Sequence, residues 1–329
     1  MPKQSLKSGK QIQSNNDTME KLLITGSNGF IGSNLLQKLS FKKFEVHTLS
    51  RNLNPKFGRN IHQHILDINQ YSEVKTLINR IKPQYVVHLA GVTTIKESVS
   101  DYLNTAKSIY VATVNLAEAC RNVQDFKQFL MAGSSKEYGS IEPKSKKIVE
   151  TTPLLPSNPY GIAKVAAEKY LAYLNTAYKF PYTVMRTFTT YGRINNTDFF
   201  IEKTIHDMLE DSEVLIIEPD AIRDWVYIDD TVEGYLHALG NKNAMGEAFN
   251  LCSGTGHTAM DVVDIIRKFT NSKSKIKIWG KSNSFDPRVL VGSNLKTFRL
   301  LDWKPMYDLE KGLKATMRSI KASHNIQKY

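Results

Sequence analysis

The chain contains little cysteine: Cys120 and Cys252 are the two among 329 residues, and no Cys-x-x-Cys pair or Cys/His cluster occurs. We therefore expect no disulfide framework and no metal site, and a reducing compartment, the cytoplasm, is the expected location. No apolar run approaches the roughly 18 residues that a membrane-spanning helix needs, so no integral membrane contact is expected. Residues 1–18 also lack the apolar segment of a secretory signal, and we expect them to form a disordered leader.

Positive charge is in excess, because 44 Lys and Arg residues outnumber 32 Asp and Glu residues and give a formal net charge of +12. Residues 254–329 hold 15 of these basic residues and 6 of the acidic ones, hence +9 of the +12. No zinc-finger or helix-turn-helix pattern accompanies the charge, which argues against a nucleic-acid partner. Two explanations stay open: a solvated basic surface, or a C-terminal domain that binds an anionic small molecule.

Short apolar segments alternate with amphipathic ones. Strands are predicted at 21–25, 44–49, 85–90, 129–132 and 182–186, and helices at 33–39, 76–81, 102–121 and 160–178. Further on, helices are predicted at 201–209, 231–239 and 261–269, and strands at 214–217, 225–228 and 273–279. The alternation is typical of an α/β fold, a Rossmann-type doubly wound parallel sheet. We predict a dinucleotide-binding domain over 19–187, with 224–253 crossing back to it, and a smaller α/β substrate domain over 188–223 and 254–329.

A glycine-rich loop follows the first predicted strand. Gly26-x-x-Gly29-x-x-Gly32 lies between that strand and the first helix, the context in which this spacing binds a dinucleotide. The first glycine permits a tight turn, the second lets a pyrophosphate approach, and the third lets helix and strand pack closely. Free N–H groups at the helix start, at Phe30 and Ile31, would receive the phosphates. A glycine-rich turn without a ligand is the simpler alternative, which the position at this junction disfavours.

The end of the second predicted strand selects between NAD and NADP. An acidic residue there would bind the ribose 2′-hydroxyl of NAD, whereas an arginine accommodates the 2′-phosphate of NADP. The chain has Ser50 and Arg51 at this place, and no carboxylate lies between Val46 and Arg59. NADP is therefore the favoured cofactor and NAD the alternative, because a loop arginine can also be merely solvated.

Tyr160 and Lys164 are four residues apart and therefore lie on one face of the helix predicted from Tyr160 onwards. Ser134 and Ser135 follow a strand that we expect beside the glycine loop. A tyrosine with a pKa of about 10 is a poor base at neutral pH, but an ammonium and a positive nicotinamide ring would favour its phenolate. Such a tyrosine exchanges a proton with an alcohol while the nicotinamide exchanges a hydride. A surface Tyr/Lys pair is the plainer explanation of this motif taken alone.

Ordered motifs extend along the chain: TGSNGFIG at 25–32, HLAG at 88–91, GSSKEYG at 133–139, NPYGIAK at 158–164, RTFTTYG at 186–192, RDWVYIDD at 223–230, FNLCSG at 249–254 and LLDWKP at 300–305. On these motifs the chain resembles the extended short-chain dehydrogenase/reductase family, in its NAD(P)-dependent nucleotide-sugar epimerase/dehydratase branch. The resemblance implies that Ser134, Tyr160 and Lys164 are catalytic. It also implies cofactor contacts from Asp67 and Ile68 near the adenine, and from Leu89, Ala90 and Gly91. For the substrate it implies Arg223 on the diphosphate, and we add Thr93, Ser135, Thr189 and Arg288.

The chain departs from the family pattern at several positions. Family dehydratases carry an acid pair directly after the catalytic hydroxyl residue, where this chain has Ser135 and Lys136, with the carboxylate displaced to Glu137. On an extended segment a shift of one residue reverses the side-chain direction, so 4,6-dehydration is disfavoured. Thr189 replaces a usual Asn, and the family arginine near the diphosphate falls at Asn283, with Arg288 as the substitute.

The expected function is NAD(P)-dependent oxidoreduction at C4 of the sugar of a nucleotide-activated hexose, by a 4-keto sugar reductase or a 4-epimerase. The alternatives are a nucleotide-sugar 4,6-dehydratase and a non-catalytic NAD(P)-binding regulator of the same fold. The resemblance also implies a homodimer, through a four-helix bundle of the helices at 102–121 and 160–178. His88 lies in a buried apolar strand, where a core histidine is a simpler explanation than a catalytic one.

Overall fold

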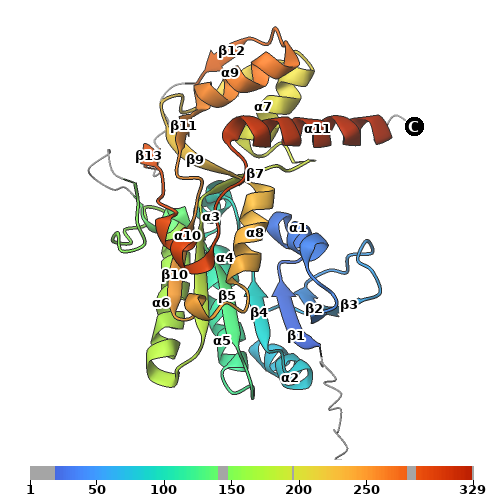
Figure 1. The fold of residues 1–329 in the computed structure, drawn as a ribbon, viewed down its shortest axis with the longest axis vertical. Coiled ribbons are helices and arrows are strands. Elements are labelled where there is room, and N and C mark those ends of the chain that lie inside the picture. The colour runs from blue at the N-terminus through green and yellow to red at the C-terminus, as the bar shows by residue number, and fades with distance from the viewer. Residues whose placement is uncertain (1–18, 140–146, 195, 280–286, 328–329) are drawn as a thin grey trace, which may run out of the picture.

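Seven parallel strands form the main sheet of the computed structural model, which describes residues 19–139, 147–194, 196–279 and 287–327 (Figure 1). The strand order is β10-β6-β5-β4-β1-β2-β3, so the order reverses between β1 and β4. The strands are β1 (Glu20–Thr25), β2 (Phe44–Ser50), β3 (Ile61–Ile65), β4 (Tyr85–His88), β5 (Gln128–Ser134), β6 (Tyr182–Thr187) and β10 (Glu247–Leu251). The predicted leader lies outside the described residues.

Helices cover both faces of this sheet. They are α1 (Phe30–Lys38), α2 (Tyr71–Ile81), α3 (Ile95–Ser100), α4 (Tyr102–Ala106), α5 (Ala112–Cys120), α6 (Pro159–Tyr178) and α8 (Ile228–Ala238). A π-helical segment, η1 (Lys107–Val111), joins α4 to α5, and η2 (Ser135–Glu137) and η3 (Lys242–Ala244) are short 3₁₀ turns. Successive residues of a strand point to opposite faces. Leu23 of β1 therefore packs with α2, α5 and α6, whereas its neighbours Leu22 and Ile24 pack with α1 and α8.

A second group of elements lies beyond the carboxyl ends of the main strands (Figure 1). One sheet contains β7 (Thr189–Tyr191), β9 (Ile222–Tyr227), β11 (Gly256–Thr258) and β13 (Val289–Leu290), and another pairs β8 (Val214–Ile216) with β12 (Ile276–Ile278). The helices of this part are α7 (Phe200–Leu209), α9 (Ala259–Thr270), α10 (Leu295–Leu301) and α11 (Leu309–Gln327). Of the segment 224–253, α8 and β10 return to the main sheet, but β9 pairs in the second sheet, so the crossing back begins at Ile228.

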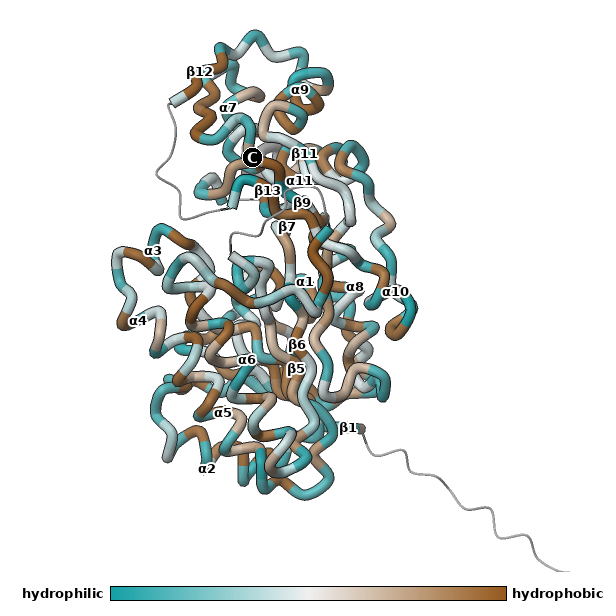
Figure 2. The backbone as a smooth tube through the Cα atoms, turned by 90° about the vertical axis from the view of Figure 1, so that its left-hand side faces the viewer, coloured by the Kyte–Doolittle hydropathy of each residue, from teal (hydrophilic) through white to brown (hydrophobic). Residues whose placement is uncertain are grey.

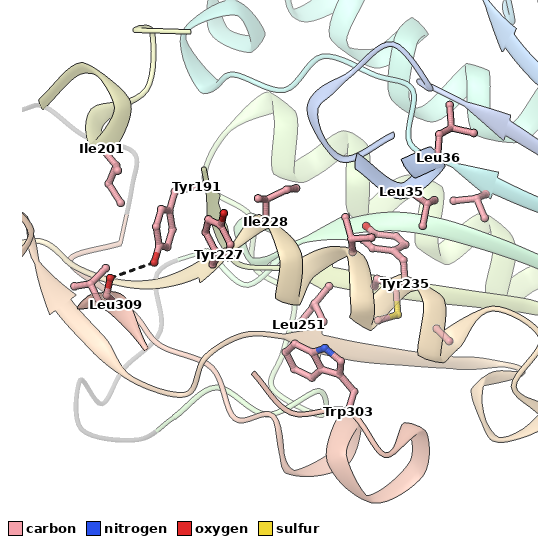
Figure 3. Close-up of a cluster of buried hydrophobic side chains, with 14 of the residues drawn as sticks. Leu35, Leu36, Tyr191, Ile201, Tyr227, Ile228, Tyr235, Leu251, Trp303 and Leu309 are labelled. Atoms are coloured by element: carbon pink, nitrogen blue, oxygen red, sulfur yellow. Dashed lines mark hydrogen bonds between the residues drawn. The ribbon is translucent and has the colours of Figure 1, made fainter. Parts of the chain in front are cut away.

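The hydrophobic core is continuous between the two parts. Figure 3 shows Tyr235 of α8 and Leu251 of β10 on the side of the main sheet, with Tyr191 and Leu309 at the other end of the same cluster. The hydroxyl of Tyr191 donates a hydrogen bond to the carbonyl of Leu309, 3.4 Å away. In Figure 2 the apolar segments follow β5 and β6 through the interior, as expected for parallel strands that are buried on both faces.

Several elements were not predicted: β3, β7, β10, β11, β13, α3, α10 and α11. Five of these are strands of two to five residues, which leave little room for an alternating pattern. Both cysteines are buried and free. Within the described residues, no helix is long and apolar enough to cross a bilayer, and no cluster of His, Cys, Asp and Glu could hold a metal ion.

Candidate active site

The site lies where β1, β4, β5 and β6 end. Carboxyl ends of parallel strands share one edge of a sheet, and a ligand crevice forms at the point where the strand order reverses, here between β1 and β4. A cavity of about 600 Å³ occupies this place. Its floor is formed by the residues after these strands, and its other side by the segment around Phe199 and by Arg223 and Trp225 of β9.

The glycine loop has the geometry that a dinucleotide requires. Gly26 has a φ of +70°, and a Cβ there would lie 2.6 Å from the backbone nitrogen of Ala90. A Cβ on Gly32 would lie 2.3 Å from the carbonyl oxygen of Gly26. Helix α1 begins after Gly29 with no side-chain cap and no acidic residue in its first turn. The loop is therefore closely packed, and the N–H groups at the start of α1 suit a phosphate. Gly26, Gly29, Phe30, Ile31 and Gly32 all line the cavity.

The predicted residues for cofactor selection lie at the carboxyl end of β2. The side chain of Asn28, in the glycine loop, donates to the carbonyl of Asn52 over 3.1 Å and approaches the Ser50 hydroxyl at 3.5 Å. Arg51 is exposed, and neither it nor Ser50 lines the cavity. The glycine loop thus touches the turn that carries Arg51, although the guanidinium stands outside the cavity.

The remaining predicted cofactor residues divide into two groups. Leu89 and Gly91 line the cavity, whereas the N–H of Ala90 is turned to the Thr25 hydroxyl, 3.3 Å away. Asp67 and Ile68 lie after β3 and outside the cavity. There, the Asp67 carboxylate accepts from the backbone N–H of residue 69, and the Ile68 carbonyl accepts from the side chain of Asn115.

Ser134, Tyr160 and Lys164 meet on the cavity wall. Ser134 is the last residue of β5, and α6 begins beside it with Asn158 as the N-cap and Pro159 in the first turn. The Ser134 side chain interacts with the Tyr160 phenol in a way that favours its ionised form. The Lys164 ammonium donates to the carbonyl oxygen of Ala132 over 2.7 Å and lies 5.8 Å from the centroid of the Tyr160 ring.

Burial dominates the pKa values of Tyr160 and Lys164. Burial raises the pKa of Tyr160 to about 12, and the interaction with Ser134 opposes that rise only in part. Burial likewise lowers the pKa of Lys164 to about 8, against the attraction of Glu137. The expectation that Lys164 and a positive nicotinamide ring together favour the phenolate stays a prediction, because these pKa values describe the protein's own groups alone. The ammonium is directed to a carbonyl rather than to the phenol, so desolvation dominates.

A buried network of charged and polar groups lies behind the part of the cavity wall that Ser134, Tyr160 and Lys164 form. The Arg186 guanidinium donates to both carboxylate oxygens of Glu168, with Nε 3.0 Å from Oε2, and to the Tyr138 hydroxyl at 2.9 Å. Glu137 Oε1 accepts from the backbone N–H of Ser134 over 2.6 Å. Burial, and then the neighbouring Glu168, raise the pKa of Glu137 well above its usual range. The Arg186 guanidinium pairs closely with Glu168, while Glu137 Oε2 lies 3.8 Å from its Nε, and the raised pKa favours the protonated form of Glu137.

Glu137 also departs from the predicted local structure. The segment after Ser134 was expected to be extended, but residues 135–137 form the 3₁₀ turn η2. Ser135 and Lys136 line the cavity, while Glu137 does not. The carboxyl is therefore withdrawn from the cavity by the turn of η2 and by its bond to Ser134, rather than by strand alternation.

His88, at the end of β4, is a buried core histidine. Its Nδ1 lies 2.7 Å from the Thr25 hydroxyl and its Nε2 lies 3.1 Å from the Thr113 hydroxyl. Both ring nitrogens are thus hydrogen-bonded inside the protein, and burial lowers the pKa of His88 to about 3. The ring takes no part in the cavity.

Four of the five predicted substrate residues line the cavity: Thr93, Ser135, Thr189 and Arg223. Arg223 is buried, and its guanidinium donates to the backbone carbonyls of residues 222 and 288 and lies 3.4 Å from the Glu218 carboxylate. Arg288 does not line the cavity; its exposed side chain stands 3.7 Å from the Asp220 carboxylate. Asn283 lies outside the described residues.

Arg193 also lines the cavity but was not predicted from the sequence. Its guanidinium carbon lies 4.1 Å from the centroid of the Phe30 ring and 3.6 Å from that of Phe199. Its main-chain N–H, like that of Gly192, donates to the buried Glu202 carboxylate over 2.9 Å. No motif surrounds Arg193. The available signal was a charged residue directly after the RTFTTYG segment.

A Rossmann-type sheet whose glycine loop shares a cavity with a serine, a tyrosine and a lysine defines a nicotinamide-dependent enzyme of the short-chain dehydrogenase type. A model of the NAD dependent epimerase/dehydratase family matches residues 22–252, and the chain belongs to this family. The predicted family, the fold class and the expectation of an enzyme are thereby confirmed.

Known relatives span nearly the whole chain. A UDP-glucose 4-epimerase of Mycoplasma pneumoniae is 28% identical, over 90% of this chain and 95% of its own length. The crystal structure of the Thermotoga maritima UDP-glucose 4-epimerase with UDP-glucose superposes with a TM-score of 0.84 at 27% identity, covering 92% of this chain and 99% of that one. The UDP-glucuronic acid 4-epimerase of Bacillus cereus, solved with UDP-glucuronic acid and NAD, gives 0.83 at 26% identity, covering 92% and 100%.

Proposed function

We propose that the protein is a 4-epimerase of a nucleoside-diphosphate hexose. The observation that carries this proposal is the convergence of Ser134, Tyr160 and Lys164 with the glycine loop around one cavity. Relatives that act on UDP-glucose and UDP-glucuronic acid support it, and these two compounds are the first substrates to test. When bound, the nicotinamide supplies hydride acceptance and return at the sugar C4.

Tyr160 is the group that moves the proton. Tyr160 lines the cavity beside Ser134, where a sugar hydroxyl would donate to the phenolate and later recover the proton. Ser134 orients the phenol and the sugar oxygen. Lys164 adds positive charge near the desolvated Tyr160. Together with a bound, positively charged nicotinamide ring, it would favour the phenolate form of Tyr160. The glycine-loop N–H groups bind the cofactor diphosphate.

Arg223 is the proposed ligand of the substrate diphosphate. It is the buried cation of β9, and Thr93, Ser135 and Thr189 provide hydroxyls around the space for the sugar. Arg288 is proposed as a second, peripheral contact, since its carbonyl accepts from the Arg223 guanidinium although its own side chain points to solvent. The positive charge of residues 254–329 fits an anionic small molecule in this part of the protein.

A 4-keto sugar reductase that uses NADP is the second candidate, favoured by the end of β2. The family is NAD-dependent, yet residues 46–59 contain no carboxylate, and Arg51 stands on the turn that the glycine loop contacts. A 2′-phosphate would find a cation there instead of repulsion. A dissociable reductant suits net reduction, whereas epimerisation returns the hydride to the same sugar.

A homodimer is proposed through α4, η1 and α6. These helices expose apolar side chains that a soluble monomer would normally cover: Tyr102, Leu103, Val111, Ile162 and Tyr173. Pairing with the same helices of a second copy would bury them in a four-helix bundle, an interface with twofold symmetry. Light scattering after gel filtration is the test, and a monomer at micromolar concentration would rule it out.

Tyr160→Phe tests the proposed function. The change removes the proton carrier and keeps the ring, so kcat with the better of the two UDP-sugars should fall by about 10²–10⁴. Tyr71→Phe, an exposed tyrosine of α2, is the matched control and should leave kcat unchanged. Product epimers are separated by chromatography and identified by NMR. Near-native turnover by a folded Tyr160→Phe enzyme would mean that the proton moves elsewhere.

A further inference from the structure

Arg193 occupies an unusual position between the two parts of the molecule. Phe30 belongs to the first turn of α1 at the main sheet, while Phe199 is the N-cap residue of α7 in the second part (Figure 1). The guanidinium carbon lies 4.1 Å from the centroid of the Phe30 ring and 3.6 Å from that of the Phe199 ring. Stacking of this kind between a cation and two aromatic faces is attractive, and more so away from water.

The side chain is fixed from behind and is open towards the cavity. Nη1 donates to the Thr190 carbonyl over 2.9 Å and lies 3.6 Å from the Glu202 carboxylate. Glu202 also accepts the main-chain N–H groups of Gly192 and Arg193, so its charge is shared among three donors. A guanidinium has five N–H donors. Hydrogen bonds within the described part of the chain use only those of Nη1, and the side chain is 16% exposed, at the cavity.

A partly buried cation that is only partly neutralised is suited to an anion, and desolvation lowers the pKa of Arg193. The anion that this cavity must accept beside Phe30 is the diphosphate of the dinucleotide, at the start of α1. Gly29, the residue before Phe30, lines the same cavity as Arg193. The planar fork of an arginine matches two phosphate oxygens.

We propose that Arg193 is a clamp on the cofactor diphosphate, which closes over the dinucleotide from the side opposite to the glycine loop and slows its release. Dissociation would require Arg193 to separate from Phe30 or Phe199, and so would require Arg193 or the start of α7 to move away from α1. The consequence for catalysis rests on the proposed function: an epimerase returns the hydride to the sugar and gains from keeping its cofactor, whereas a reductase must exchange it at every turnover.

The test measures cofactor retention directly on the full-length enzyme. Purified protein is passed through gel filtration and denatured, and the released nicotinamide dinucleotide is counted by enzymatic cycling. We expect wild type to retain much more dinucleotide than Arg193→Ala. On nucleotide-free protein, the Kd for NAD should weaken by about 10- to 100-fold in Arg193→Ala, the range for a lost charged hydrogen bond. Arg318→Ala, at an exposed arginine of α11, is the matched control and should behave as wild type.

Two further variants sharpen the result. Arg193→Lys keeps the charge but loses the planar fork and most of the stacking, so its Kd for NAD should lie between those of wild type and Arg193→Ala. Phe199→Leu keeps the cation and removes one ring, and the rate of NAD release should rise. This second variant decides the question if Arg193→Ala does not fold.

An unchanged Kd for NAD in folded Arg193→Ala would overturn the proposal, and so would an unchanged release rate in Phe199→Leu. Weaker binding of UDP-glucose with unaltered NAD binding would also overturn it, because Arg193 would then be a substrate residue. Saturating NAD should restore most of the turnover of Arg193→Ala. If wild type converts no sugar nucleotide, the proposed function fails, but dinucleotide counting still decides whether the clamp exists.

Discussion

Replacement of Lys164 by methionine should change how stability depends on pH. Lys164 is 6% exposed and its pKa is lowered by burial from 10.5 to about 8 in the folded protein. The unfolded chain therefore binds one more proton than the folded protein between these two values. Stability consequently rises with pH across this window, because the unfavourable burial of the ammonium is relieved as the amine loses its proton. Methionine has no proton to lose, so Lys164→Met should lack this rise.

The magnitude follows from the two pKa values. With a folded pKa of about 8 and an unfolded pKa of about 10.5, the linkage relation gives wild type a gain of about 2 kcal/mol in the free energy of unfolding between pH 7 and pH 9.5. The hydrogen bond from Nζ to Ala132 is lost in the variant at every pH, and because the neutral amine also donates, its loss adds a nearly constant offset. The test is therefore the difference between wild type and Lys164→Met in how steeply the free energy of unfolding changes with pH.

Urea unfolding of nucleotide-free wild type and Lys164→Met, followed by tryptophan fluorescence at both pH values, measures this slope. Ionisation of surface groups affects both proteins equally and cancels in the difference. Parallel stability profiles from pH 7 to pH 9.5 would refute the reasoning, since Lys164 would then titrate alike in the folded and unfolded chains.

Three other changes test separate parts of the site. Arg51→Ala should weaken NADP by about 10- to 100-fold and NAD much less, if the 2′-phosphate receives a charged hydrogen bond; equal losses in a titration would reject the assignment. His88→Gln should reduce the loss of stability on acidification, because the pKa of His88 is about 3 in the folded protein and 6.5 in the unfolded chain. Between pH 6.5 and 4.5 wild type should lose about 2 kcal/mol relative to the variant in urea unfolding. Glu137→Gln should keep kcat and its pH profile close to wild type, since an amide mimics the protonated carboxyl; a shifted profile would show that Glu137 is ionised.

Five strands of the main sheet, β1, β2, β4, β5 and β6, were predicted from the sequence because they are largely buried and follow one another through regular crossovers, whereas the edge strands β3 and β10 were not. The segment Tyr85–His88, for example, is an unbroken apolar run, and the glycine loop marks the first crossover. The second part was less readable. Its strands are as short as Val289–Leu290 and depend on pairing with β9 from distant segments, which no local pattern encodes. Helix α11 is different, since Leu313, Met317 and Ile320 are buried at helical spacing and carried a usable signal.

The site was predicted where a motif fixes both residue type and position. Ser134, Tyr160 and Lys164 line one cavity because a strand end and a helix start stand side by side, which their motifs imply. The electrostatics were not predictable in this way. The pKa of Tyr160 depends on how deeply its hydroxyl is desolvated and on the direction of the Lys164 ammonium, and both follow from packing. Arg193 was not predicted because no motif marks it and because one of its two aromatic partners, Phe30, lies far from it along the chain.

The distribution of carboxyl groups around the cavity bears on which reaction this site can perform. Elimination of water across C5–C6 needs an acid and a base at that end of the sugar, in addition to the tyrosine at C4. Glu137 is held behind the wall by the Ser134 N–H and faces Arg186 and Glu168 instead. The Glu202 carboxylate lines the cavity but is engaged by two main-chain N–H groups and by Arg193. Asp198 also lines the cavity, but from a position just before α7 rather than next to Ser134. Under the proposed function proton transfer at C4 falls to Tyr160, and neither of the two residues directly after Ser134 carries a carboxyl, which suits inversion or reduction at C4 rather than dehydration.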